Sequence, residues 1–328
     1  MRLAQPPTVP PHRRLLPLRV GTRASPLARV QTRAFLAVLR TFCPVLRDLD
    51  VFEEHAIRTT GDAVQDRSLA DIGGKGLFAK EIHEALHDGR VDFAVHSLKD
   101  LETALPPGIV LACTLSREDA RDALILGPGC GAPDPADPLA ALPHGARVGT
   151  SSVRRQAQLL HARPDLRVVL LRGNVQTRLA RVREGAVDAS LLALAGLRRL
   201  GLEGEASAVL APETMLPAAG QGIVGVTVRA DDTGLRDLLA AIEDPAARAV
   251  ATAERALLAE LDGSCRTPIG GYARLLEDGR LVLSGLVARA DGGFLLRRTI
   301  SGPAADAAAL GRALGHSLRA ESPPDLFA

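Results

Sequence analysis

The chain is poor in aromatic side chains and in net charge. Its 328 residues include no Trp, one Tyr and seven Phe, so aromatics make up 2% of the sequence. So few rings exclude a surface on which nucleic-acid bases stack. A formal net charge of +2 at pH 7 gives no bulk electrostatic attraction to nucleic acid. We therefore expect no nucleic-acid partner.

Long apolar runs are also missing. No stretch approaches the ~20 consecutive apolar residues that a membrane helix needs. Residues 1–17 carry several Arg and Pro residues but no continuous apolar core, so they do not resemble a signal peptide. We expect a flexible extension over 1–17, no membrane association and a cytoplasmic location.

Cysteine and lysine are scarce too. The four cysteines, at positions 43, 113, 130 and 265, are far apart and form no Cys-x-x-Cys pair. Neither a zinc ribbon nor a disulfide framework is indicated. Of the 40 basic residues only Lys75, Lys80 and Lys99 are lysines. Compositional bias can explain that total, so only the positions of the arginines bear on function.

One structural unit occurs twice along the chain. A short apolar segment ends in Arg19–Thr22, and Ser25-Pro26 then favours a helix start, with Ser as N-cap and Pro at the first position. Arg147–Thr150 repeats this pattern before a helix expected over 153–160. We predict two related α/β domains in which strands and helices alternate around mostly parallel sheets.

The character of the sequence changes near Pro245. A helix is expected over 246–261, and apolar runs over 281–287 and 294–300 are split by Asp291-Gly292-Gly293, a hairpin pattern. A final helix is expected over 304–319. These elements predict a third, smaller α+β domain.

Two short segments carry candidate chemistry. Lys99 and Asp100 directly follow a strand expected over 91–97, and ligands bind at the carboxyl ends of strands in open α/β sheets. A solvated Lys–Asp pair on a turn is an equally good interpretation. Cys265 lies in a Gly-rich loop beside Arg266, which favours the thiolate. An inert buried cysteine is the alternative.

Three strand-to-helix loops combine Arg with hydroxyl or amide side chains. They are 22–25, 150–155 and 171–178. Free N–H groups at a helix start attract anions, and guanidinium groups bind carboxylates through two hydrogen bonds. Simple helix caps with solvated arginines are the alternative, but three such loops favour a small ligand with several negative charges.

His83 and His87 match the H-E-x-x-H pattern of zinc enzymes. Both fall off the axis of the apolar stripe of their expected helix, on the side that also bears Lys80. We therefore expect solvated histidines and no metal site, with a zinc hydrolase as a less favoured hypothesis. The run Gly73–Gly76 is no Walker motif, because no Ser or Thr follows its Lys.

Several motifs in order now resemble the porphobilinogen deaminase (hydroxymethylbilane synthase) family over residues 18 to 320. The matching segments are Gly21–Ala28, Thr60–Asp62, Gly73–Glu81, Ala94–Asp100, Arg117–Asp119, Val148–Gln156, Leu171–Leu179, Leu216–Gly222 and Ala253–Gly270. The resemblance implies two doubly wound domains like type II periplasmic binding proteins and a smaller C-terminal α+β domain. The implied boundaries are 18–115 with 222–240, 116–221, and 241–328.

The resemblance also implies the reaction. Four porphobilinogen molecules, each with an acetate and a propionate, lose their amines and condense on a dipyrromethane cofactor, and the linear tetrapyrrole is then released. Asp100 is the implied catalytic residue, supported by Lys99, and Cys265 holds the cofactor covalently. The implied substrate contacts are Arg23, Ser25, Phe78, Arg172, Arg178 and Arg199. The implied cofactor contacts are Arg23, Ser25, Lys75, Ser97, Thr150, Ser151, Ser152, Arg154, Arg155, Arg172, Gly173, Asn174, Arg178 and Gln221.

One departure from the family pattern lies near Asp100, where Glu102 stands in place of a common Pro. We expect a monomer whose partner is the small molecule porphobilinogen. The main competing hypothesis is a binding protein of periplasmic type that captures an anion and does no chemistry.

Overall fold

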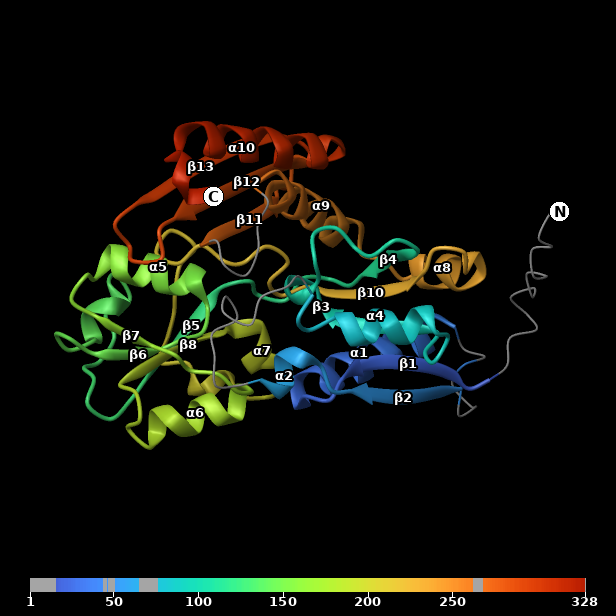
Figure 1. Ribbon diagram of the computed structural model, residues 1–328, viewed down its shortest axis with the longest axis horizontal. Coiled ribbons are helices and arrows are strands. Elements are labelled where there is room, and N and C mark those ends of the chain that lie inside the picture. Colours follow the sequence, from blue (N-terminus) through green and yellow to red (C-terminus); the bar gives the residue numbers. More distant parts are fainter. Residues whose placement is uncertain (1–15, 44–45, 47–50, 65–75, 262–267, 328) are drawn as a thin grey trace.

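The computed structural model describes residues 16–43, 46, 51–64, 76–261 and 268–327. These residues form two five-stranded sheets and one three-stranded sheet. In Figure 1 the sheet that contains β5 to β8 lies on the left, and the sheet that contains β1 to β4 lies on the right. The C-terminal elements lie across the top of both.

The first sheet has the strand order β2-β1-β3-β10-β4. Strand β10 returns from far along the chain and runs antiparallel to both neighbours, while β1 pairs in parallel with β2 and β3. The strands are β1 (Leu18–Arg23), β2 (Phe52–Ile57), β3 (Phe93–Ser97), β4 (Ile109–Thr114) and β10 (Val224–Arg229). The helices of this unit are α1 (Pro26–Phe42), α2 (Thr60–Ala63), α4 (Lys80–His87) and α8 (Thr233–Ala240).

The second sheet repeats this arrangement with the order β7-β6-β8-β5-β9. Here β5 runs antiparallel to both neighbours, and β6 pairs in parallel with β7 and β8. The strands are β5 (Asp122–Leu126), β6 (Arg147–Gly149), β7 (Arg167–Val169), β8 (Ala189–Ala193) and β9 (Ala208–Val209). The helices are α5 (Val153–Ala162), α6 (Val175–Arg183) and α7 (Leu194–Arg199).

The third unit is an antiparallel sheet covered by two helices. Its elements are α9 (Pro245–Glu260), β11 (Ile269–Leu275), β12 (Arg280–Ala288), β13 (Leu295–Pro303) and α10 (Ala307–Glu321). A short 3-10 turn, Ala304–Asp306, precedes α10, so the last helix begins three residues later than expected. The predicted fold class, two related α/β units and a smaller α+β unit, is confirmed.

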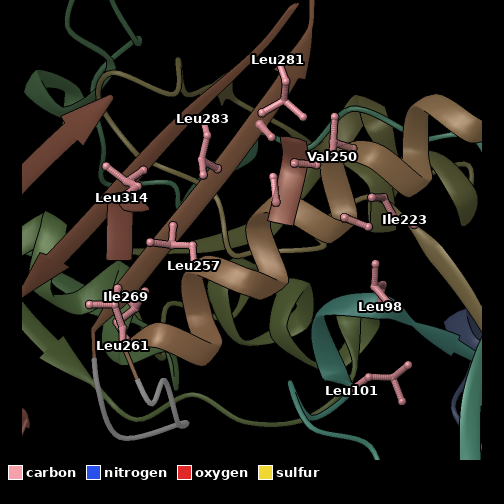
Figure 2. Close-up of a cluster of buried hydrophobic side chains, with 14 of the residues drawn as sticks. Leu98, Leu101, Ile223, Val250, Leu257, Leu261, Ile269, Leu281, Leu283 and Leu314 are labelled. Carbon is pink, nitrogen blue, oxygen red and sulfur yellow. The ribbon is translucent and has the colours of Figure 1, made fainter. Parts of the chain in front are cut away.

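One apolar cluster joins the third unit to the first. Leu257 of α9 packs with Leu281 and Leu283 of β12, as Figure 2 shows. The same cluster contains Leu98, the first residue of the 3-10 turn Leu98–Asp100 after β3, and Leu101, which directly follows that turn. Burying a leucine side chain contributes about 1.5–3 kcal/mol. The turn that carries Lys99 and Asp100 is therefore anchored on both sides.

No helix within the described part of the chain is long and apolar enough to cross a membrane.

Candidate active site

A cavity of about 750 Å³ is lined by residues of all three units. The 3-10 turn after β3 and the first turns of α1, α5 and α6 line it, and so do Leu258 of α9 and Ile269 of β11. Most of the predicted site residues meet here. Those that line the cavity are Arg23, Ser25, Phe78, Lys99, Asp100, Ser151, Ser152, Arg154, Arg155, Arg172, Gly173, Asn174, Arg178 and Gln221.

Three predicted residues lie beside the cavity lining. Thr150 is buried behind it and accepts a hydrogen bond from Ser152 N at 3.1 Å. Arg199 donates to Gly222 O at 2.6 Å. Ser97 lines a small adjoining pocket and donates to Gln31 Oε1 at 3.0 Å. Two further predictions, Lys75 and Cys265, fall outside the described residues.

Three helices begin at the cavity wall, each with a side-chain cap. Ser25 Oγ accepts from Ala28 N at the start of α1. Ser152 Oγ accepts from Arg155 N at the start of α5, and Asn174 Oδ1 accepts from a backbone N–H at the start of α6. Because each helix start carries a partial positive charge, the three together favour a ligand with negative groups.

Asp100 lies 2.9 Å from the guanidinium of Arg23, measured from Oδ2 to NH1. The same guanidinium binds Asp62 through its other two nitrogens and stacks on the Phe78 ring at 4.2 Å. Asp62 also accepts from the Thr59 hydroxyl. Arg23 is thus clamped between two carboxylates and a ring. The sequence analysis did not identify Asp62 as part of this arrangement.

The Lys99 amine donates to Gln221 Oε1 at 3.1 Å. The residue is exposed to the cavity, yet protein atoms crowd the amine. This desolvation, together with nearby Arg155, lowers the pKa of Lys99 to about 8. A neutral fraction of the amine is therefore accessible at mildly alkaline pH.

Arg154 and Arg155 are both held by Asp122, a completely buried carboxylate that the sequence analysis missed. Each arginine donates to one Asp122 oxygen at 2.8 Å. Burial alone would raise the pKa of Asp122, but the two guanidinium groups lower it well below its usual range. Both arginines line the cavity, but some of their N–H groups already donate to Asp122.

Arg172 and Arg178 carry positive charge on the α6 side of the cavity. Arg172 donates across to Gly61 O of the first unit at 2.7 Å. Arg178 donates through Nε to Gly173 O at 3.0 Å. Burial, Arg155 and Arg172 together lower the pKa of Arg178 to about 10. A group of cations that destabilise one another is suited to an anionic ligand.

The charge of the lining is unbalanced. Seven basic and three acidic side chains contribute to it, so the formal excess is four positive charges. The basic residues are Arg23, Arg58, Lys99, Arg154, Arg155, Arg172 and Arg178, and the acidic ones are Asp62, Asp100 and Glu102. This composition fits a small molecule with several carboxylates.

The prediction of two solvated histidines on α4 is wrong for one of them. His87 is exposed, but His83 is 2% exposed and its ring lies 5.6 Å from that of buried His96. His83 Nδ1 lies 3.7 Å from Glu102 Oε2. The apolar stripe of α4 is wide enough to bury a ring on its flank. Within the described residues, no group of three His, Cys, Asp or Glu side chains is arranged to hold a metal ion.

Comparison with known proteins gives matches over nearly the whole chain. The family model "Porphobilinogen deaminase, dipyromethane cofactor binding domain" matches residues 18–237, and "Porphobilinogen deaminase, C-terminal domain" matches residues 249–320. A porphobilinogen deaminase of Roseiflexus castenholzii is 52% identical over 92% of this chain and 95% of that protein. A chloroplastic porphobilinogen deaminase of Oryza sativa is 45% identical over 94% of this chain and 85% of that protein.

Among solved structures, a putative periplasmic sulfonate-binding protein of Methylobacillus flagellatus matches 73% of this chain and 66% of its own. Its sequence identity is 15% and the TM-score is 0.37.

Proposed function

The chain belongs to the porphobilinogen deaminase family, and from this premise we propose which of its residues carry the reaction. The enzyme is a transferase of porphyrin and haem biosynthesis. It condenses four porphobilinogen molecules, with loss of ammonia, into the linear tetrapyrrole hydroxymethylbilane, and it uses a dipyrromethane cofactor. The alternative of an anion-binding protein without chemistry is not favoured by these matches.

The cavity lining fits the cofactor. Two linked pyrroles carry four carboxylates, and the lining has four more basic than acidic side chains. Among the described residues, the terminal nitrogens of Arg178 have no hydrogen-bond partner, since only its Nε donates, to Gly173 O. When bound, the cofactor supplies the primer on which pyrrole units are added.

We assign the carboxylate contacts to the arginine side of the cavity. Arg23, Arg172 and Arg178, with Ser25 and Asn174 at helix starts, hold acetate and propionate groups through charge-assisted hydrogen bonds. The further contacts come from Arg154, Arg155, Ser151, Ser152, Gly173 and Gln221, with Ser97, Thr150 and Arg199 as more distant members and Phe78 packing beside the rings. Lys75 stays a proposed cofactor contact outside the described residues. Each charge-assisted bond contributes about 1.5–3 kcal/mol.

Asp100 is the proposed catalytic residue. It sits on a turn anchored by Leu98 and Leu101, so its carboxylate is fixed in the cavity. As a carboxylate it stabilises positive charge that develops on the pyrrole during deamination and coupling. Lys99 supports Asp100 electrostatically, because its amine lines the same cavity. The observation that carries this proposal is that the Lys99–Asp100 turn and the arginine cluster share one cavity.

We propose Cys265 as the attachment point of the cofactor. Leu258 and Ile269, which precede and follow the cysteine segment in the chain, both line the cavity. This supports a thioether link from the third unit into the site. A thiolate is the form that reacts, and neighbouring Arg266 favours it.

Intact-mass spectrometry tests the attachment. The purified protein is expected to carry an adduct of two linked pyrroles, and Cys265→Ser is expected to lack it. Cys130→Ser is the matched control and should keep the adduct. An unmodified mass in active wild-type enzyme would refute the attachment at Cys265.

The domain boundaries are also a proposal: 18–115 with 222–240, 116–221, and 241–328, after an N-terminal extension over 1–17 that lies mostly outside the described residues. The three separate sheets support these divisions. We further propose that the enzyme works as a cytoplasmic monomer on porphobilinogen, without nucleic-acid or membrane partners.

A further inference from the structure

We propose that Asp122 is a positioning residue of this site: it orients Arg154, Arg155 and Gln221 and, through Gln221, fixes the Lys99 amine in the cavity. Asp122 does not line the cavity itself. The inference rests on the proposed roles of Lys99 and the two arginines, and it adds the group that holds them together.

Asp122 lies on β5, completely buried, and its carboxylate accepts from three side chains. Oδ2 accepts from Arg154 NH2 at 2.8 Å. Oδ1 accepts from Arg155 NH2 and from Gln221 Nε2, each at 2.8 Å. These donors come from α5 and from the segment that returns toward β10. One carboxylate therefore ties two separate walls of the cavity together.

Asp122 is the anion that both buried arginines share. Within the described residues, the other acceptors of the two guanidinium groups are backbone carbonyls: Arg154 NH1 donates to Leu216 O, and Arg155 NH1 donates to Leu191 O at 2.7 Å. Carbonyls can orient a guanidinium but cannot neutralise its charge. Without Asp122 the two cations would stand uncompensated side by side, and at least one would be pushed toward the cavity.

Asp122 also decides which way the Gln221 amide faces. Gln221 Nε2 donates to Ala120 O at 2.6 Å as well as to Asp122 Oδ1. With its NH2 group held by two acceptors, the amide must present Oε1 on its other side, where it accepts from Lys99 Nζ. A flipped amide would instead point NH2 at the ammonium of Lys99.

The protonation of the Lys99 amine consequently depends on the charge of Asp122. The charged groups that act on it are Arg155 and Arg154 on α5, Asp122 on β5, and Asp100 on its own turn. The arginines favour the neutral amine, and the two carboxylates favour the ammonium. Removing the Asp122 charge is expected to lower the pKa of Lys99.

Competitive acylation of lysines measures this effect directly. The chain has three lysines, and Arg90 separates Lys99 from Lys80 in an arginine-specific digest. Exposed Lys80 serves as the internal reference in the same sample. Purified holoenzyme is labelled across a pH series, and the Lys99 to Lys80 ratio is read by mass spectrometry.

Asp122→Asn is expected to raise the Lys99 labelling ratio at pH 7 by about three- to fivefold, because the neutral fraction of the amine rises by that factor when a pKa of about 8 falls by half a unit to one unit. The matched control is Asp188→Asn, which removes an Asp–Arg pair, with Arg147, from the same sheet away from the cavity. Its ratio should equal that of the wild type. An unchanged ratio in folded Asp122→Asn would overturn the proposal.

If Asp122→Asn does not fold, Gln221→Met tests the same proposal. This variant leaves both Arg–Asp122 pairs in place and removes the Gln221 amide, with its hydrogen bonds to Asp122, Ala120 and Lys99. The labelling ratio should rise in the same direction but less. A wild-type ratio in Gln221→Met would also overturn the proposal. Intact mass, measured on the same samples, reports cofactor attachment separately, so failure of the proposed function can be recognised on its own.

Discussion

Asp100 and Asp62 share one guanidinium, that of Arg23, yet they have different expected roles. Asp62 is bound by two Arg23 nitrogens and by Thr59, so its lone pairs are largely used. Asp100 takes a single Arg23 nitrogen at 2.9 Å and lines the cavity. Asp100 therefore has a carboxylate oxygen available for substrate, whereas Asp62 mainly positions Arg23.

Asp100→Asn is expected to lower kcat by about 10²- to 10³-fold, because a neutral amide does not stabilise developing positive charge. Cofactor attachment should persist, and intact mass checks it. Steady-state kinetics with porphobilinogen supply the rate. Asp62→Asn is the control: if Asp100 acted only by holding Arg23, both variants would lose activity equally. We expect the Asp62→Asn loss to be at least tenfold smaller.

Some residues that the sequence analysis predicted at this site have a local pattern, whereas others, such as Phe78 and Gln221, were implied only by the family resemblance. Lys99 and Asp100 follow a strand, and Ser25 and Ser152 precede helices. The positions of these four residues can therefore be predicted from their neighbours in the chain. Asp122 and Asp62 have no such pattern. Their roles depend on arginines 32 and 39 positions away, and only the folded chain brings those charges together.

At the scale of elements, helix starts were predicted well and strand directions less well. The helix start predicted at Ser25-Pro26 is the start of α1 in the structure. Such starts can be predicted because capping is a local interaction. The reversed directions of β10 and β5 depend on where the chain re-enters each sheet. That is a long-range property, and an apolar run reads the same in both directions.

Helix α4 packs on β3 through an unusual pair of buried rings. His83 of α4 lies against His96 of β3, and His96 Nε2 is 2.9 Å from Thr227 Oγ1 of β10. Desolvation and the charge of His87 lower the pKa of His83 to about 4. Desolvation and His83 lower that of His96 to about 3. Both rings are neutral in the folded enzyme at neutral pH.

This pair predicts acid sensitivity. In the unfolded chain these histidines take up protons near pH 6.5, whereas in the folded chain they stay neutral down to about pH 4. Their contribution to the free energy of unfolding is therefore complete above pH 6.5 and is lost as the pH falls through this window. The expected loss between pH 6.5 and 4.5 is about 4 kcal/mol for the two rings together. Urea unfolding at a series of pH values measures it.

His83→Gln should flatten that pH dependence, because a side chain that takes up no proton replaces one of the two rings. His316→Gln, at an exposed position on α10, should leave the slope unchanged. If His83→Gln and the wild type lost stability in parallel from pH 6.5 to 4.5, the slope would have to come from carboxylates instead.

On the scale of the whole molecule, the three units meet at an ion pair whose glutamate is completely buried. Arg117 lies on the segment that leads from β4 to β5, and Glu254 lies on α9 with no exposed surface. Arg117 NH1 donates to Glu254 Oε1 at 2.6 Å, and Arg117 Nε donates to Gln221 O on the returning segment at 2.9 Å. Glu254 also accepts from Gly220 N and Ala273 N.

Sequence patterns could divide the chain into units but could not place this junction. Arg117 and Glu254 are 137 positions apart, and each belongs to a motif that reads as an ordinary run of charges. Their contact fixes both connecting segments of the two α/β units to one helix of the third. The arrangement of the cavity walls thus depends on a pair that lies outside the lining.

Glu254→Gln is expected to destabilise the enzyme by about 3–5 kcal/mol, because it leaves the Arg117 charge without its partner and weakens two backbone contacts. Denaturant unfolding followed by two probes, circular dichroism and Tyr272 fluorescence, measures the loss. Glu260→Gln, the same change six positions later on α9, should stay within about 0.5 kcal/mol of the wild type. A Glu254→Gln enzyme as stable as Glu260→Gln would mean that apolar packing of α9, through Leu257 and its neighbours, holds the three units together without the ion pair.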